Sequence, residues 1–248
     1  MRRRKLRYRI AESLGYDLAK KKRNAHAYPD LHVAHVLEAS GVNCVIDVGA
    51  NVGQYGEGLR KAGYAGRIVS FEPVAAIFEE LAHKASGDPE WVCHPFALGS
   101  QDRVQPMNVM TSSVFSSFLS TTQLAEERFT DQIPIERVED VQVRRLDSLL
   151  HEIVAGLAAP RIFLKMDTQG YDLEVFSGAG SSLDRVVGLQ SELSLNPLYE
   201  GMPTFLDALG TYQKHGFRVT GFYPVSRDSS RLTLLEVDCV MVRDRIAE

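Results

Sequence analysis

Short apolar runs alternate with helix-like segments along most of this chain, and this alternation restricts the fold more than any other feature. Five runs are expected as strands, over 44–48, 67–71, 91–96, 162–166 and 186–193. Helical spacing is found over 31–39, 54–62, 75–85 and 204–215. Strands joined through such helices pair in parallel, so the sequence predicts a doubly wound α/β domain.

Two further β-like runs, 217–223 and 232–242, close the chain. Only a short polar turn from Ser226 to Arg231 separates them, which leaves no room for a crossover helix. They should therefore pair antiparallel and finish the parallel sheet as a hairpin.

The stretch at about 100–145 does not follow this alternation, and we assign it as an insert in a single domain over 41–248. A long insert beside the carboxyl edge of a doubly wound sheet is a natural cap for a substrate site. Its serines, among them Ser116 and Ser117, are candidates to hydrogen-bond a polyol. The alternative is a serine-rich loop that binds nothing.

The first residues of the chain are strongly basic, whereas the rest of the chain is acidic. The net charge is −4, yet residues 1–23 hold ten Lys or Arg residues against Glu12 and Asp17, a net of +8. We assign 1–40 to a basic helical arm with an apolar stripe from Leu6 to Leu18. Such an arm could contact a membrane surface, nucleic acid or an acidic subunit, including a second copy, or remain solvated.

Cysteine usage and hydropathy bear on location. Cys44, Cys93 and Cys239 each lie in an apolar run, and no CxxC pair suggests a disulfide or zinc framework. No apolar stretch has the length of a membrane span or a signal peptide. We therefore expect reduced core cysteines in a cytoplasmic protein.

The segment from Val45 to Tyr55 carries the strongest chemical signal. A strand ends in a turn at Gly49, and Gly53 opens the next helix. Asp47 sits where it would repel a pyrophosphate but attract a sulfonium and an ammonium. The acidic Gly loop therefore favours S-adenosylmethionine over a nicotinamide cofactor. Glu72, at the end of the second strand, is placed to accept hydrogen bonds from a ribose diol.

Four blocks in order resemble the FkbM family of methyltransferases: Ile46–Tyr55, Ser70–Pro73, Leu164–Asp172 and Glu192–Glu200. The resemblance spans about Asn43 to Arg243. It implies a class I methyltransferase fold and methylation of hydroxyls on sugars, glycolipids or other natural products. One departure is Asp172, where the family usually has Glu.

The resemblance and the residue chemistry agree on a cofactor site. The methionine moiety is expected against the Gly loop, and Glu72 is expected to hold the ribose. The adenine is expected beside the end of the third strand. The cofactor residues assigned in this way are Asp47, Gly49, Asn51, Gly53, Gln54, Tyr55, Glu72, Ala97 and Leu98.

Asp167 and Glu192 are the candidate catalytic residues, because they end neighbouring strands. An alcohol must lose its proton during methyl transfer, which requires a base or a metal. The two carboxylates could act as base and orienter, could bind Mg²⁺, or could be structural. Lys165 could form an ion pair with either of them. His94 is the next candidate, although a core role is the alternative.

Two rival functions remain at this stage. Asn196-Pro197-Leu198-Tyr199 resembles the motif of adenine N-methyltransferases, but it follows the fifth strand rather than the fourth. With an acidic body as well, we expect no nucleic-acid substrate; N-methylation of a small molecule is the related alternative. A non-catalytic S-adenosylmethionine-binding module is the second rival. We expect a small-molecule or glycan acceptor.

Overall fold

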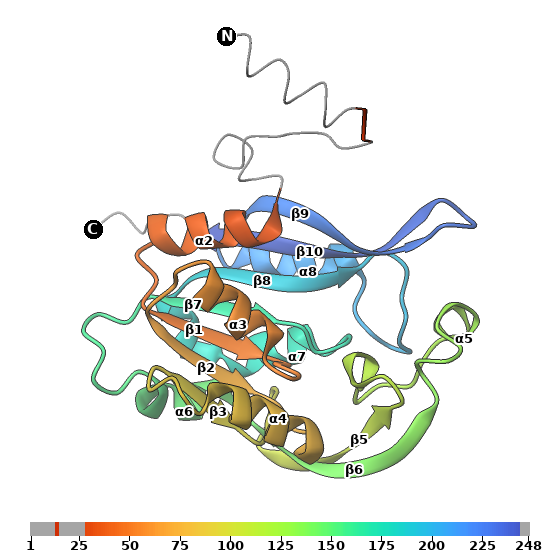
Figure 1. Cartoon of the computed structure of the whole chain (residues 1–248), viewed down its shortest axis with the longest axis horizontal. Helices are drawn as coiled ribbons and strands as arrows, with labels where there is room; N and C mark the ends of the chain where they lie inside the picture. The colour runs from red at the N-terminus through yellow and green to blue at the C-terminus, as the bar shows by residue number, and fades with distance from the viewer. Residues whose placement is uncertain (1–12, 15–27, 244–248) are drawn as a thin grey trace.

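A seven-stranded sheet forms the centre of the computed structural model, which describes residues 13–14 and 28–243 (Figure 1). Its strands are β1 (Cys44–Val48), β2 (Arg67–Phe71), β3 (Trp91–His94), β7 (Ile162–Met166), β8 (Val186–Ser194), β9 (Phe217–Asp228) and β10 (Thr233–Arg243). They lie in the order β3-β2-β1-β7-β8-β10-β9. The first five are parallel, and β10 is antiparallel to both of its neighbours. The predicted mostly parallel sheet with a terminal hairpin is confirmed.

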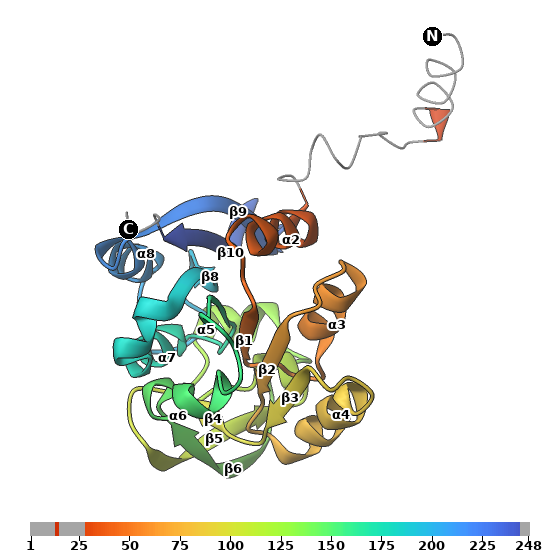
Figure 2. The same cartoon turned by 90° about the vertical axis from the view of Figure 1, so that its left-hand side faces the viewer.

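Helices cover both faces of this sheet (Figure 2). On one face lie α2 (Pro29–Ala39), α3 (Gln54–Lys61) and α4 (Ala75–Ala85); on the other lie α6 (Leu146–Ile153), α7 (Asp172–Gly178) and α8 (Phe205–Lys214). Each face has its own apolar cluster. Because β1 and β7 are covered on both sides, every residue in them is buried, as expected for central parallel strands.

Helix α2, within the stretch that the sequence assigns to the arm, packs on the sheet. Val33, Val36 and Leu37 join the core cluster of its face. The hydroxyl of Tyr223 on β9 lies 2.6 Å from Nδ1 of His32. Of residues 1–27, only Ser13 and Leu14 are described, so the basic arm lies almost entirely outside the described residues.

The third strand is shorter than predicted, because β3 stops at His94 rather than Phe96. Pro95 follows it and has no N–H to donate to a strand ladder. The chain then turns into β4 (Ala97–Leu98), which leaves the main sheet and pairs with β6 (Ile135–Arg144) in a second sheet. The prediction of one strand over 91–96 was therefore wrong at its end.

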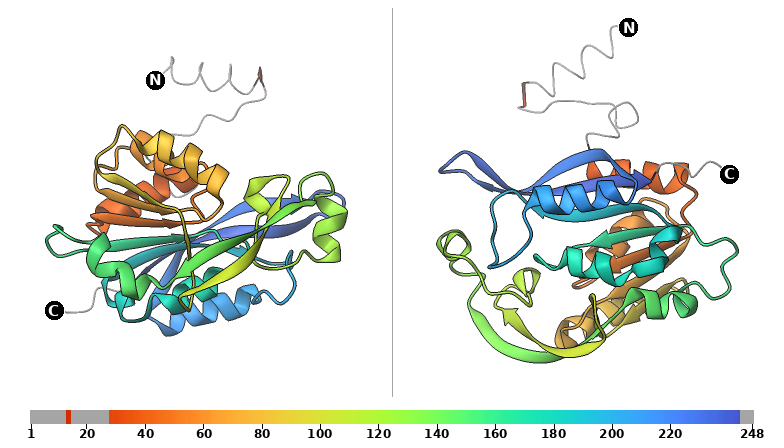
Figure 3. Two further views of the ribbon diagram at one scale, coloured as in Figure 1. Left: turned by 90° about the horizontal axis from the view of Figure 1, so that it is seen from below. Right: turned by 180° about the vertical axis from the view of Figure 1, so that it is seen from behind.

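The insert builds most of this second sheet, whose order is β4-β6-β5. It comprises β5 (Arg103–Met110), the short 3-10 helix η3 (Ser113–Phe115), α5 (Gln123–Arg128) and β6. Figure 3 shows the insert extending beside the β9–β10 hairpin. Arg128 of α5 and Asp228 of β9 form an ion pair at 2.6 Å, so these two distant segments are joined.

The terminal hairpin is also longer than predicted. Strand β9 continues to Asp228, which pairs with Thr233, so the turn lies after the predicted Ser226. Asp228 accepts hydrogen bonds from the backbone N–H groups of Ser230 and Arg231 and thereby stabilises the turn. Residues 226–231 were predicted to lie in the turn because they are polar, and so the end of β9 was missed.

The described residues contain no helix long and apolar enough to cross a membrane. Cys44 and Cys239 are buried in strands, Cys93 is half-buried, and all three are free thiols.

Gly49 is required by packing between β1 and β7. Its φ is +72°, and a Cβ there would overlap the backbone carbonyl oxygen of Asp167. Gly53 has a φ of +82°, and a Cβ there would lie 2.8 Å from Leu81 and 3.2 Å from Trp91. Neighbouring elements of the fold therefore leave no room for a side chain at either glycine of the loop.

We expect Gly49→Ala to lower the free energy of unfolding by more than about 2 kcal/mol. The new Cβ would clash with the backbone of Asp167, and alanine is also strained at a positive φ. Gly58→Ala is the matched control: Gly58 lies inside α3 and a Cβ there meets nothing within 4 Å. That control should be neutral or stabilising by about 0.5–1 kcal/mol. Urea denaturation measures both. Equal stability of the two variants would contradict this account of the loop.

Candidate functional site

A cavity opens at the carboxyl ends of the parallel strands, and the insert forms its opposite wall. The lining includes most of the residues that the sequence assigned to the cofactor, the catalytic pair and the acceptor: Gly49, Asn51, Gln54, Glu72, Ala97, Leu98, Ser116, Asp167 and Glu192. Strand order arranges them from Glu72, just after β2, across Gly49 and Asp167, to Glu192 on β8. Four separate blocks of the sequence thus meet in one place.

Four of the assigned residues do not line this cavity. Gly53 packs against Leu81 and Trp91 as described above. Tyr55 lies beside a different hollow between α2 and α3, and its hydroxyl donates to Oε1 of Gln190 at 3.0 Å. The structure therefore places Tyr55 in support of β8 rather than at the cavity.

Ser117 and Asp47 are the other two. Ser117 is 1% exposed, and its hydroxyl donates to the backbone carbonyl of Gln169 at 2.8 Å. Asp47 is completely buried beneath the Gly loop and forms an ion pair with Lys165 at 3.1 Å. In the structure as it stands, the Asp47 carboxylate faces this lysine.

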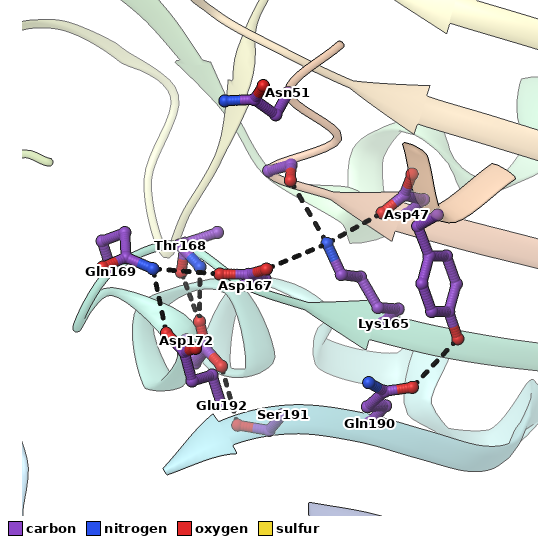
Figure 4. Close-up of polar contacts among 12 residues, drawn as sticks. Asp47, Asn51, Lys165, Asp167, Thr168, Gln169, Asp172, Gln190, Ser191 and Glu192 are labelled. Carbon is purple, nitrogen blue, oxygen red and sulfur yellow. Dashed lines mark hydrogen bonds and ion pairs between the residues drawn. The ribbon is translucent and has the colours of Figure 1, made fainter. Parts of the chain in front are cut away.

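Lys165 lies at the centre of a buried polar group (Figure 4). Its Nζ is 3.1 Å from Oδ1 of Asp47 and 3.5 Å from Oδ2 of Asp167, and it donates to the carbonyl oxygen of Gly49 at 3.2 Å. Burial alone would lower the pKa of Lys165, but Asp47 and Asp167 raise it above its usual value. The sequence suggested an ion pair with Asp167 or Glu192; the structure shows one with Asp167 and adds Asp47.

Gln169 connects the two candidate catalytic residues, and the sequence reasoning missed it. Its Nε2 donates to Oδ1 of Asp167 at 3.1 Å and to Oε2 of Glu192 at 2.9 Å (Figure 4). Its Oε1 accepts a hydrogen bond from the hydroxyl of Tyr199 at 2.8 Å. Gln169 adopts a φ of 52°, a strained conformation for a residue other than glycine. That strain, invisible in the sequence, directs the amide between the two carboxylates.

Glu192 and Glu236 are two further carboxyl groups that line the cavity. Burial raises the pKa of Glu192 well above its usual value, and the charges of Asp167 and Glu236 raise it further. Burial also raises the pKa of Glu236, with Asp167 adding to the effect. Each of the two therefore takes up a proton at a higher pH than an ordinary carboxyl group. Glu236 comes from β10, and nothing in the sequence singled it out.

Glu72 is held in place by the backbone around it. Its Oε2 accepts from the N–H of Asn51 at 3.0 Å and its Oε1 from the N–H of Val74 at 2.9 Å. Burial raises the pKa of Glu72 to about 7, although these two hydrogen bonds oppose the effect. Each oxygen keeps lone pairs for a ligand in the cavity that Glu72 lines.

Asn51 ties the Gly loop to the insert. It has a φ of 47°, and its Nδ2 donates to Oγ of Ser113 at 3.0 Å. Ser116 lines the cavity, and its Oγ accepts from the backbone N–H of Met110 at 3.2 Å. The serine cluster of the insert thus both supports and lines the cavity wall.

Asp172, the departure from the family pattern, supports the loop that carries Asp167. Its Oδ1 accepts from the N–H and the hydroxyl of Thr168, at 2.9 and 2.5 Å. Its Oδ2 accepts from the hydroxyl of Ser191 at 2.7 Å. Asp172 begins α7 and does not line the cavity. Its shorter side chain therefore serves a structural role in this chain.

Asp167 and Glu192 do not fit a Mg²⁺ site. A divalent cation needs several free oxygen ligands, whereas the ammonium of Lys165 and the amide of Gln169 already occupy oxygens of this pair. Within the described ranges, no group of three or more His, Cys, Asp or Glu side chains could hold a metal. His94 lies apart from the cavity lining and stacks on Phe71 at 5.1 Å, and burial lowers its pKa.

The buried ion pair gives a stability prediction. Lys165→Met should cost about 3–5 kcal/mol of unfolding free energy, because it leaves the Asp47 carboxylate buried without a counter-charge. Adding Asp47→Asn should recover at least half of that loss. Lys61→Met is the matched control, since Lys61 is 71% exposed and pairs only with Glu57 on the surface. Chemical denaturation of the four proteins tests this; no recovery in the double variant would show that the pair is not coupled.

Comparison with known proteins places the chain in a family. The model of the FkbM methyltransferase domain matches residues 47–219. No curated protein matched the chain. Among solved structures, an rRNA methylase from Streptococcus thermophilus is similar at a TM-score of 0.45 and 11% identity, over 87% of this chain and 96% of that one.

A putative S-adenosylmethionine-dependent methyltransferase from Listeria monocytogenes is similar at a TM-score of 0.45 and 7% identity, over 87% of this chain and 98% of that one. The domain match covers more than half of the sequence and includes the Gly loop, Glu72, Asp167 and Glu192. With its α/β sheet and antiparallel terminal strands, the chain therefore belongs to the FkbM family of S-adenosylmethionine-dependent methyltransferases and has the class I methyltransferase fold.

Proposed function

We propose that this protein is an O-methyltransferase that acts on a hydroxyl of a sugar, glycolipid or other natural product, with Asp167 as the general base. The observation that carries the proposal is the setting of Asp167. Its side chain is 37% exposed at the tip of β7, faces the cavity, and is fixed by Lys165 on one side and Gln169 on the other. In the order of the sheet, its strand β7 lies between β2, which Glu72 follows, and β10, which carries Glu236.

The residues of the cavity fit S-adenosylmethionine. Glu72 offers lone pairs for the two ribose hydroxyls, and Ala97 and Leu98 supply an apolar surface for the adenine. Gly49, Asn51 and Gln54 remain the residues proposed for the methionine moiety. When bound, the cofactor supplies a methyl carbon that its sulfonium has already activated.

The remaining requirement is proton removal from the acceptor. A base must be ionised and accessible at neutral pH. Glu192 meets this poorly, since burial and neighbouring carboxylates raise its pKa well above the ordinary value. Asp167 has the positive charge of Lys165 within 3.5 Å to balance its own. We therefore assign the base role to Asp167 and an orienting role to Glu192, through their shared contact with Gln169.

Methylation of nucleic-acid bases gains no support from the site. The tetrapeptide Asn196–Tyr199 does not line the cavity. Tyr199 is 1% exposed, and its hydroxyl is held by the carbonyl of Phe115 and the amide of Gln169. The motif therefore serves to brace the insert and the loop after β7.

Asp167→Asn keeps the shape of the side chain and removes its proton affinity. We expect turnover with the true acceptor to fall roughly 10²- to 10⁴-fold while cofactor affinity stays nearly unchanged. Asp184→Asn is the matched control: Asp184 is exposed and does not line the cavity, so this variant should behave like the parent. Release of S-adenosylhomocysteine from labelled cofactor measures turnover. If Asp167→Asn turns over at the rate of the parent, Asp167 is not the base. If EDTA abolishes the activity and added Mg²⁺ restores it, the reaction depends on a metal ion.

Glu72 predicts a pH-dependent affinity for the cofactor. Its pKa of about 7 means that it is largely protonated at pH 6 and ionised at pH 8. Ribose hydroxyls bind more strongly to the ionised form, so affinity should rise roughly tenfold from pH 6 to pH 8. Glu72→Gln should flatten this dependence, whereas the exposed Glu80→Gln should retain it. Calorimetry at both pH values measures the affinity for the cofactor. If the affinity of Glu72→Gln still rises with pH, the pH dependence comes from another group.

A further inference from the structure

The end of the cavity farthest from Glu72 is built by the terminal hairpin. Glu236 of β10, with Val225 and Ser226 of β9, lines this end. Sheet order places them beyond Asp167 and Glu192, in the sequence β2-β1-β7-β8-β10-β9. The cofactor residues gather around β1 and β2. The hairpin end therefore lies on the acceptor side of Asp167.

This lining carries four carboxyl groups and, among the described residues, no cationic side chain. Glu72, Asp167, Glu192 and Glu236 line the cavity, and no Lys, Arg or His among the described residues does. Lys165, the nearest buried cation, lies behind Asp167 and faces Asp47. Because no cationic side chain lines this end and the proposed base Asp167 is ionised beside it, a phosphate or carboxylate on the acceptor would lose its water without gaining a counter-charge and would be repelled by Asp167.

Glu236 is oriented for hydrogen bonding to a neutral group. It is 5% exposed, and its Oε2 accepts from Oγ of Ser226 at 2.7 Å while its Oε1 accepts from Oγ of Ser194 at 3.4 Å. These serines fix the carboxyl group and leave it further lone pairs.

Apolar side chains complete this part of the wall. Phe115 and Phe129 lie 4.8 Å apart between ring centroids, tilted by 43°, and both line the cavity with Val114 and Val225. A few polar groups set among aromatic and aliphatic side chains suit a ligand that has both hydroxyls and C–H faces. A sugar ring has this character.

We propose that the hairpin end of the cavity binds an uncharged sugar ring of the acceptor, and that Glu236 is the positioning residue that selects which hydroxyl faces Asp167. This inference rests on the proposed function and narrows it: acceptors whose ring carries a phosphate or a carboxylate are excluded. The aromatic pair contacts the C–H face of the ring, and Glu236 and Ser226 contact its hydroxyls.

Saturation-transfer NMR on the full chain with S-adenosylhomocysteine tests the charge preference without knowledge of the natural acceptor. The probes are the methyl glycosides of glucose, mannose and rhamnose, compared with methyl glucuronide and glucose 6-phosphate. We expect saturation of the neutral rings and at least tenfold weaker binding of the two anions. Stronger binding of either anion, or no saturation of any neutral glycoside, would overturn the proposal.

Variants of Glu236 test the positioning role. Glu236→Ala should weaken binding of the neutral glycoside roughly 10- to 100-fold, and Glu236→Gln less, because the amide keeps the shape and some hydrogen bonds. The affinity for S-adenosylhomocysteine should change less than twofold in both. Ser226→Ala removes the 2.7 Å contact to Glu236 together with the hydroxyl of Ser226 that faces the ring; it should weaken glycoside binding at least roughly threefold and serves if Glu236→Ala does not fold. Glu38→Gln, exposed on α2, is the matched control.

A second readout separates this proposal from the proposed function. With a glycoside that is methylated, Glu236→Gln should yield a mixture of positional isomers, whereas the parent should yield one. Unchanged glycoside affinity in both Glu236→Ala and Ser226→Ala would overturn the positioning role. If neutral glycosides bind through Glu236 but are never methylated, the subsite stands and the assignment of Asp167 as base to a sugar hydroxyl fails.

Discussion

The buried contacts of Lys165 hold the site together. One ammonium group joins Asp47 at the end of β1 to Asp167 just beyond β7, and it also binds the carbonyl of Gly49. Two neighbouring strands and the loop between β1 and α3 are thereby held at one point. Since Asp47 is completely buried, its charge is tolerable only with this partner. The position of the proposed base thus depends on an acidic residue from a distant part of the sequence.

Around that point, the loop after β7 is fixed by side chains that do not react. Asp172 anchors Thr168 to β8 through Ser191, while Gln169 places its amide between Asp167 and Glu192. Tyr199 and Ser117 in turn hold Gln169 from opposite sides, at its side chain and its carbonyl. A strained glutamine held by four contacts is a rigid support. Such rigidity is what a reaction governed by positioning requires.

The proposed acceptor side of the cavity comes from parts of the chain added to the parallel sheet. The insert contributes Phe115 and Phe129, and the terminal hairpin contributes Val225, Ser226 and Glu236. Arg128 and Asp228 join these two parts directly. The proposed cofactor side is built from the ends of the parallel strands and the turns that follow them. In this proposal different parts of the chain select the substrate and bind the cofactor, so the family alone does not determine the acceptor.

The local sequence was sufficient to locate the parallel strands and the Gly loop, and to predict that Glu72, Asp167 and Glu192 lie at one edge of the sheet, because burial on two faces and tight turns leave clear patterns in neighbouring residues. It could not show that Gly49, which lines the cavity, also packs on the carbonyl of Asp167, or that Asp47 pairs with Lys165. Gln169, Glu236 and the true extent of the hairpin became visible only in three dimensions. Their roles depend on contacts between residues far apart in the chain, and no local pattern records such contacts.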